Sequence, residues 1–158
     1  QDRTNQTVML PKFLMKLCEK VGRRMRKNDY VARGIHAWVM YEDGDFWHKG
    51  MKTGAYLYTT QDIYYYAKHI LDMRPYTKIV IKMGVTVYAL MPGIPEQLSL
   101  FDGVQGDPKE LSRALDAIND RYGDNVVGSA LLANMGGFVL DRIAFGGTKD
   151  VVDLYEEA

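Results

Sequence analysis

The chain has 158 residues, of which 47% are hydrophobic and 25% are charged, as is usual for a globular protein with an apolar core. Its 20 basic and 20 acidic residues give a net charge of zero, which argues against a strong nonspecific nucleic-acid binder. The single cysteine excludes an internal disulfide, and the apolar runs are too short to span a membrane. We therefore expect a monomeric cytoplasmic protein without membrane association.

Charge is distributed unevenly along the chain. Residues 1–82 hold 15 of the 20 Lys and Arg residues, whereas residues 102–158 hold 11 Asp and Glu residues. Such asymmetry indicates regions with different functions. We predict a domain over residues 1–90, a linker rich in proline and glycine over residues 91–106, and a C-terminal extension over residues 107–158.

The first part of the chain is expected to begin with a short strand over residues 3–10. Pro11 then suits the first turn of a helix. Apolar residues at helical spacing extend this helix as far as Asn28-Asp29. The stripe consists of Leu14, Leu17, Cys18, Val21 and Met25.

Alternating apolar and polar residues predict three further strands, over residues 31–41, 46–55 and 77–88. A second helix, capped by Thr59 or Thr60, is expected between the last two. The order β-α-β-β-α-β predicts an α+β fold, with a four-stranded antiparallel sheet and two helices on one face. The other sheet face would stay open to a partner.

The C-terminal extension is expected to be small and helical. Asp107 suits the N-cap of a helix, Pro108 its first position, and Glu110 completes a pattern like a capping box. Gly123 would end this helix. Its apolar stripe consists of Leu111, Leu115, Ile118 and Tyr122.

The sequence offers no catalytic constellation. The three histidines are too far apart for a zinc motif, and residues 146–149 do not match a phosphate-binding loop. The acidic segment Glu42-Asp43-Gly44-Asp45 is predicted to form a turn. It does not match an EF-hand calcium loop, because the Glu required at the twelfth loop position is missing. We predict no catalytic residue, no metal site and no cofactor in this chain, which disfavours a small-molecule enzyme.

The linker contains an unusual apolar segment, Gln97-Leu98-Ser99-Leu100-Phe101. Large apolar side chains in an exposed linker are unfavourable unless they bind something. A short segment with two or three apolar anchors and one polar residue fits a groove on a partner protein. The same side chains would also be satisfied if they packed against their own domain, and the residues alone leave both alternatives open.

This segment resembles the peptide with which bacterial proteins bind the sliding clamp. Residues 4–101 resemble the end of Y-family DNA polymerases of the polymerase IV and V (ImpB/MucB/SamB) type. In these, a strand ending in Leu-Pro precedes a basic helix, as at Met9-Leu10-Pro11. The sequence patterns of the strands that follow this helix in the family are also present here. They are matched by Ala32-Arg33-Gly34-Ile35, Tyr41, Asp45-Phe46 and Gly84-Val85-Thr86-Val87.

The resemblance implies a "little finger", the non-catalytic region of an error-prone translesion polymerase that acts in DNA repair and SOS mutagenesis. Such a region lays its open sheet face against template-primer DNA, including damaged DNA, while a following peptide binds the sliding clamp. The polymerase active site, a nucleotidyltransferase centre that uses Mg²⁺, belongs to another part of the parent protein. We therefore expect this chain alone not to polymerise DNA. Its clamp-binding residues would be Gln97, Leu98, Ser99, Leu100 and Phe101.

Two arguments give candidate DNA-binding residues. The resemblance points to Lys52 and Thr53, and with less support to Arg33. Independently, cations on strands of one sheet can contact phosphates without reading the base sequence. These cations are Lys49, Lys52, Lys78 and Lys82.

The open face also departs from the family pattern. Positions that are often polar or basic in relatives hold His36, Trp38 and Met40, and Ile81 stands where an Arg is common. The apolar side chains and the zero net charge favour an alternative function, that of a protein-interaction adaptor that does not bind DNA.

Overall fold

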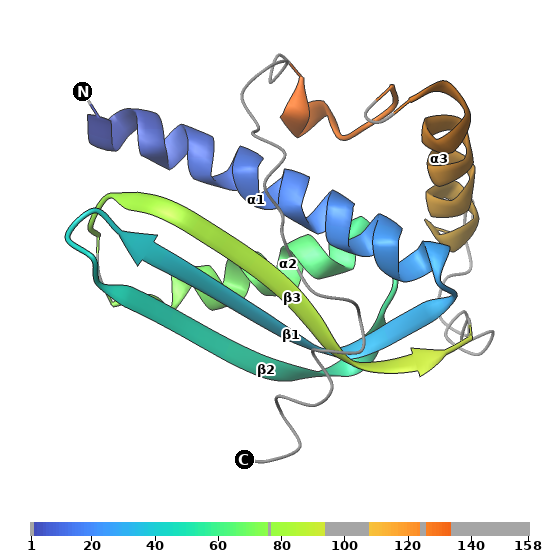
Figure 1. The fold of residues 1–158 in the computed structure, drawn as a ribbon, viewed down its shortest axis with the longest axis horizontal. Coiled ribbons are helices and arrows are strands. Elements are labelled where there is room, and N and C mark those ends of the chain that lie inside the picture. The colour runs from blue at the N-terminus through green and yellow to red at the C-terminus, as the bar shows by residue number, and fades with distance from the viewer. Residues whose placement is uncertain (1, 76, 94–107, 124–125, 134–158) are drawn as a thin grey trace.

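The computed structural model describes residues 2–75, 77–93, 108–123 and 126–133. Within them, three antiparallel strands form one sheet in the order β2-β1-β3, and two long helices pack on one of its faces (Figure 1). The predicted α+β class is confirmed. The elements are α1 (Asp2–Lys27), β1 (Tyr30–Tyr41), β2 (Phe46–Leu57), α2 (Thr60–Asp72), β3 (Val80–Pro92), α3 (Pro108–Tyr122) and the 3₁₀ turn η2 (Ala130–Leu132).

The predicted strand over residues 3–10 is wrong. These residues form the beginning of α1, which continues through Pro11 without a break. Proline removes one backbone hydrogen bond from a helix interior. The apolar spacing continues across it, since Leu10 packs against the same core as Leu14. The described part of the sheet therefore has three strands instead of the predicted four.

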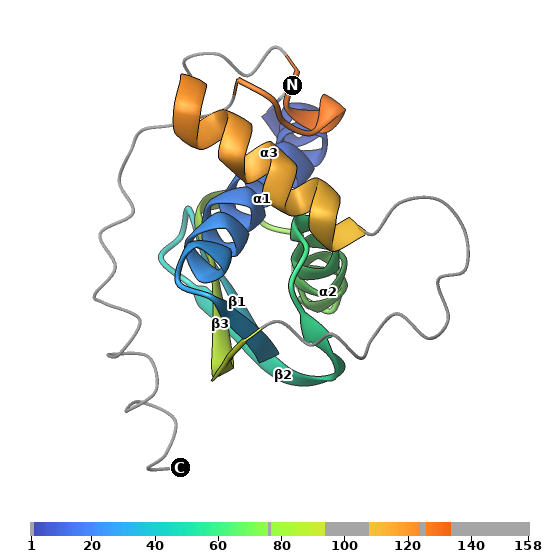
Figure 2. The same ribbon diagram turned by 90° about the vertical axis from the view of Figure 1, so that its right-hand side faces the viewer.

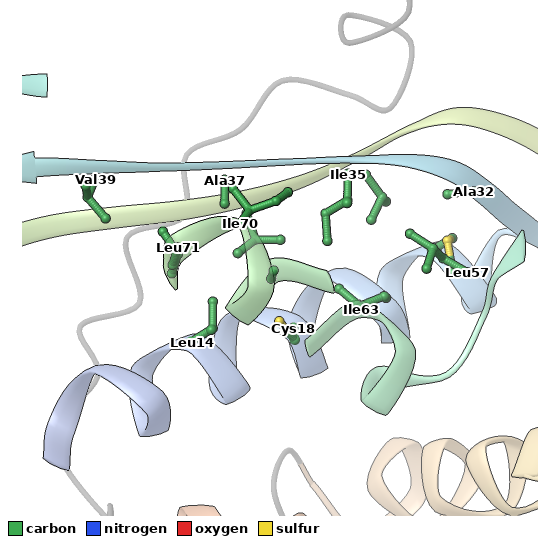
Figure 3. Close-up of a cluster of buried hydrophobic side chains, with 14 of the residues drawn as sticks. Leu14, Cys18, Ala32, Ile35, Ala37, Val39, Leu57, Ile63, Ile70 and Leu71 are labelled. Carbon is green, nitrogen blue, oxygen red and sulfur yellow. The ribbon is translucent and has the colours of Figure 1, made fainter. Parts of the chain in front are cut away.

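The core lies between the sheet and helices α1 and α2. Figure 3 shows side chains of β1 pointing toward both helices, with α1 and α2 on the same side of the strands. The thiol of Cys18 is fully buried there, and burial, followed by the charge of Glu19, raises its pKa. This confirms that Cys18 is a core residue. The fully buried inward residues of β1 are Ala32, Ile35, Ala37, Val39 and Tyr41.

Two register shifts change which side chains face the core. The first, between Ala32 and Gly34, buries Ala32 and leaves Arg33 exposed, although strict alternation placed Arg33 beside Ile35. The second, between Met40 and Tyr41, pairs Tyr41 with Val80. Val80 is consequently buried and Ile81 is 55% exposed, the reverse of the predicted pattern. Bulges insert a residue and interrupt the two-residue period on which such predictions depend.

Helix α2 begins as the sequence predicts. The Thr59 hydroxyl accepts a hydrogen bond from the Asp62 backbone N–H at 3.1 Å. In return, the Asp62 carboxylate accepts one from the Thr59 N–H at 3.3 Å. This capping box satisfies two backbone donors that the first turn of a helix leaves free.

Helix α3 crosses over the C-terminal part of α1 (Figure 2). The Arg26 guanidinium binds both oxygens of the Asp116 carboxylate, with distances of 2.6 and 3.0 Å, and also donates to the Tyr58 carbonyl at 2.9 Å. At a more exposed site, Arg23 pairs with Asp120 at 2.6 Å. The polar side of α3 thus faces α1.

The apolar stripe of α3 points largely outward. Leu111 and Tyr122 are 60% and 64% exposed, and Ile118 is also exposed. No helix in the described ranges is both long and apolar enough to cross a membrane.

Candidate nucleic-acid interface

The sheet face opposite α1 and α2, here called the open face, is defined by the alternate residues of the three strands. Cross-strand partners share a face of a sheet, so the pairing of Trp38 with His48 and Gly84 fixes its membership. None of its residues is acidic. They are Gly34, His36, Trp38 and Met40 on β1, Phe46, His48, Gly50 and Lys52 on β2, and Lys82, Gly84, Thr86 and Tyr88 on β3.

Two of the predicted DNA-binding lysines lie on the open face, at opposite corners. Lys52 is paired with Gly34 at one end of β1, and Lys82 with Met40 at the other. The six-residue offset along β1 corresponds to about 20 Å. Both lysines are exposed, and among the described residues no carboxylate pairs with either. This spacing allows contact with two separate phosphates.

The middle of the open face is aromatic. The ring centroids of Trp38 and Phe46 are 5.7 Å apart, those of Phe46 and His48 5.6 Å, and those of His48 and His36 5.2 Å. Tyr88 lies alongside on β3. These five residues are called the ring platform below.

Within the platform, the Nε2 atom of His36 and the Nδ1 atom of His48 are 3.0 Å apart. A hydrogen bond between them requires a proton on one nitrogen and a lone pair on the other. Burial, followed by the charge of His48, lowers the pKa of His36, which favours its neutral form. Among the described residues, no third His, Cys, Asp or Glu joins this pair to make a metal site.

Two other predicted DNA-binding residues, Arg33 and Lys49, are not among the paired residues that define the open face. The guanidinium of Arg33 is 5.0 Å from the centre of the Tyr56 ring and donates to the Gly54 carbonyl at 3.2 Å. Lys49 is paired with Ala37, a core residue, and therefore belongs to the helix-side face, at the exposed edge of β2.

The last two lie in local hydrogen-bond networks. Thr53 is buried, and its hydroxyl donates to the Ala55 carbonyl at 2.7 Å. Lys78 precedes β3 and forms ion pairs with Asp43, at 2.6 Å, and with Asp45 in the β1–β2 turn. The hydrogen bond to Asp43, followed by the one to Asp45, raises the pKa of Lys78. The hydrogen bond between Lys78 and Asp43 also lowers the pKa of Asp43.

The candidate site thus differs from the one assembled from sequence. Of the six predicted DNA-binding residues, the structure brings Lys52 and Lys82 onto the open face with His36 and Trp38. Phe46, His48 and Tyr88 were not assigned to the open face from sequence, although strand alternation is consistent with that position for all three. The predicted clamp-binding residues 97–101 lie outside the described residues.

Comparison with known proteins gives a match to one protein family and several similar proteins. Residues 2–100 match the impB/mucB/samB family C-terminal domain. The chain is 29% identical over 127 residues to DNA polymerase IV of Clostridium acetobutylicum, a match that covers 80% of this chain and 32% of that protein. It is 32% identical over 121 residues to DNA polymerase IV of Moorella thermoacetica, covering 75% of this chain and 30% of that protein.

A third relative has a different name. UvrX of Bacillus subtilis, which is named for UV-damage repair, is 27% identical over 137 residues, covering 85% of this chain and 33% of that protein. The chain therefore spans about a third of the length of the curated relatives that it matches.

Proposed function

Since this chain belongs to the impB/mucB/samB family and contains the C-terminal domain of that family, a region of Y-family DNA polymerases, we propose that it holds template-primer DNA for a translesion polymerase. The open face would contact the sugar-phosphate backbone. The chemical step and its Mg²⁺ ions would belong to the part of such a polymerase that this chain does not match. The chain would then act by positioning DNA, in damage tolerance.

The observation that carries the proposal is the charge pattern of the open face. Lys52 and Lys82 stand at its two ends, and no acidic residue lies between them. Phosphate contacts of this kind are independent of base sequence, as a polymerase that accepts any template requires. Lys78 contributes less, because Asp43 and Asp45 already neutralise its charge.

The direct test is titration of the chain with a fluorescent primer-template over a range of salt concentrations. Each phosphate contact that is lost should reduce the slope of log K against log salt by about 0.9. The double variant Lys52→Gln, Lys82→Gln should therefore bind more weakly and with a flatter slope. The matched control is Lys68→Gln, because Lys68 is an exposed lysine on α2 that pairs with Asp72. An unaltered slope in the double variant would place the DNA contact on another surface.

A second part of the proposal concerns the linker. Gln97, Leu98, Ser99, Leu100 and Phe101 would bind the sliding clamp and keep the polymerase on DNA by raising its effective concentration. Support comes from the three apolar anchors of the segment and from its position at the C-terminal end of the match to the family domain, which covers residues 2–100.

Substitution of two anchors tests the clamp interaction. Leu100→Ala together with Phe101→Ala should weaken clamp binding by at least about 30-fold, as expected for interface anchors, and leave DNA binding unchanged. Ser99→Ala is the control, since that position supplies no anchor. A double variant that retains full affinity for the clamp would remove this assignment.

A second candidate function is a protein-interaction adaptor. It is favoured by exposed apolar side chains on two surfaces, Phe46 on the open face and Leu111 and Tyr122 on α3. The titration separates the two candidates, because an adaptor would show no DNA affinity even at low salt.

A further inference from the structure

The ring platform is supported by glycines on the neighbouring strands. A Cβ atom on Gly84 would lie 2.3 Å from the indole nitrogen of Trp38, and one on Gly34 would lie 2.3 Å from the Tyr88 ring. Each ring therefore occupies the space that a side chain would take on the next strand. Both rings lie across the backbone of the sheet instead of standing upright from it.

Tyr88 spans the width of the sheet in this way. Its ring crosses Gly34 on the central strand, and its hydroxyl oxygen is 3.6 Å from the position that a Cβ atom would take on Gly50 of β2. Glycines on two strands thus make room for one side chain. The result is an aromatic surface that lies close to the backbone of the sheet and is built from residues of all three strands.

This surface is accessible. Phe46 is 53% exposed, His48 is exposed, and Trp38 and His36 are half-buried. In the described part of the chain, both long helices pack on the other face of the sheet (Figure 3). A contiguous exposed apolar surface is a mark of a binding site.

We propose that the ring platform stacks on the bases of single-stranded DNA, such as unpaired template beside a primer-template junction. This inference rests on the proposed function, because it names a second form of DNA for the same face. Aromatic side chains stack on any base, since every base has a π-face. In a duplex the base faces are already stacked on one another, so the platform gains this contact only with unpaired bases.

Charge favours a nucleic acid over a peptide as the occupant. Lys52 and Lys82 flank the platform, and the open face carries no carboxylate. A cationic groove that contains aromatic side chains is the usual arrangement for binding single strands without sequence preference. The lysines would contact phosphates while the rings contact bases.

The two tryptophans of the chain provide a specific reporter. Trp38 lies on the platform, whereas Trp47 packs against the core on the opposite face. A Trp47→Phe variant leaves Trp38 as the single tryptophan, whose emission can be excited selectively over that of the tyrosines. Its emission should be quenched by a short oligothymidine strand and much less by a blunt duplex or by an abasic strand of equal charge.

Substitution of Phe46, an exposed ring of the platform, measures the contribution of stacking. In the full chain, Phe46→Ala should weaken oligothymidine binding roughly 10-fold, consistent with the loss of one stacked base, and change duplex binding by less than about twofold. The matched control is Tyr65→Ala, because Tyr65 is 67% exposed on α2, away from the platform. Circular dichroism would verify that both variants fold.

The outcomes separate this inference from the proposed function. Salt-sensitive duplex binding through Lys52 and Lys82, with no quenching of Trp38 by saturating oligothymidine, would overturn the stacking inference alone. Equal affinity of Phe46→Ala and the unaltered chain for oligothymidine would do the same. Absence of binding to both single strands and duplex would overturn the proposed function and the inference together.

Discussion

The indole ring of Trp38 on β1 lies across Gly84 on β3, so that a Cβ atom on Gly84 would come within 2.3 Å of the ring nitrogen. The two residues are direct cross-strand partners. The glycine is therefore required by the packing of a neighbouring side chain. The geometry of the open face depends on this pair and on its counterpart, Tyr88 over Gly34.

Replacing this glycine should disturb both stability and the site. Gly84→Ala forces the indole away from the sheet, and we expect a loss of about 1–3 kcal/mol in the free energy of unfolding, as for other overpacked positions. Chemical denaturation would measure it, and the emission of Trp38 in a Trp47→Phe background should shift. Gly54→Ala is the matched control, because a Cβ atom on Gly54 of β2 would meet open space. Equal stability of the two variants would contradict this account.

His36 should make stability depend on pH. Because the pKa of His36 is lowered from its ordinary value of 6.5, the folded chain binds fewer protons than the unfolded chain between the two pKa values. The contribution of His36 to the free energy of unfolding is then complete above pH 6.5 and is lost as the pH falls toward the folded-state pKa. His36→Gln should flatten this part of the pH profile.

The control for this measurement is His69→Gln, since His69 is exposed on α2. Denaturant unfolding of the three proteins between about pH 8 and pH 5 would test the linkage. A His36→Gln profile parallel to that of the unaltered chain would show that this histidine does not carry the effect.

Two nearby lysines should differ in their effect on DNA binding. Lys78 is held by Asp43 and Asp45, whereas no carboxylate in the described ranges pairs with Lys82. Lys82→Gln should therefore reduce affinity for a primer-template more than Lys78→Gln, although both remove one charge. Fluorescence anisotropy at low salt would show the difference. A larger loss from Lys78→Gln would mean that the turn, and not the open face, meets the phosphates.

The attachment of α3 should depend on one carboxylate. The side chain of Arg26 is only 6% exposed, so loss of its partner Asp116 leaves a buried charge with fewer hydrogen bonds. Breaking such a pair costs at most about 3–5 kcal/mol, and less if α3 detaches as a unit. Asp116→Asn should therefore increase amide hydrogen exchange throughout α3 while the sheet stays protected.

Asp120→Asn provides the comparison within the same helix. Its ion pair with Arg23 is exposed to solvent, and exposed pairs contribute little. Exchange in α3 should change little in this variant. Identical exchange in the two variants would show that the buried pair does not hold the helix.

Much of the fold follows from local sequence patterns. The capping box at Thr59 and the strand alternation of β1 were predictable because each depends on residues close together in the chain. The start of α1 was not, since Leu-Pro after a Thr- and Val-containing segment is compatible with either a strand or a helix. The choice depends on whether Leu10 packs with Leu14, which is a tertiary contact.

The candidate site was less predictable for a similar reason. Burial of Thr53 and pairing of Lys78 with the β1–β2 turn depend on residues that approach only after folding. The two register shifts moved Arg33 and Ile81 to faces that a regular alternation does not give. The complementarity of Gly84 and Trp38 requires the register of β1 and β3, which sequence spacing alone does not fix.

Nuclear magnetic resonance can locate the surface of this chain that contacts DNA. Amide chemical shifts of the isotopically labelled chain would be followed during titration with a primer-template. If the open face meets DNA, the largest changes will cluster on β1, β2 and β3 around Trp38, His48 and Lys82, while α2 is unaffected. Changes confined to α2 or α3, with the three strands unperturbed, would contradict it.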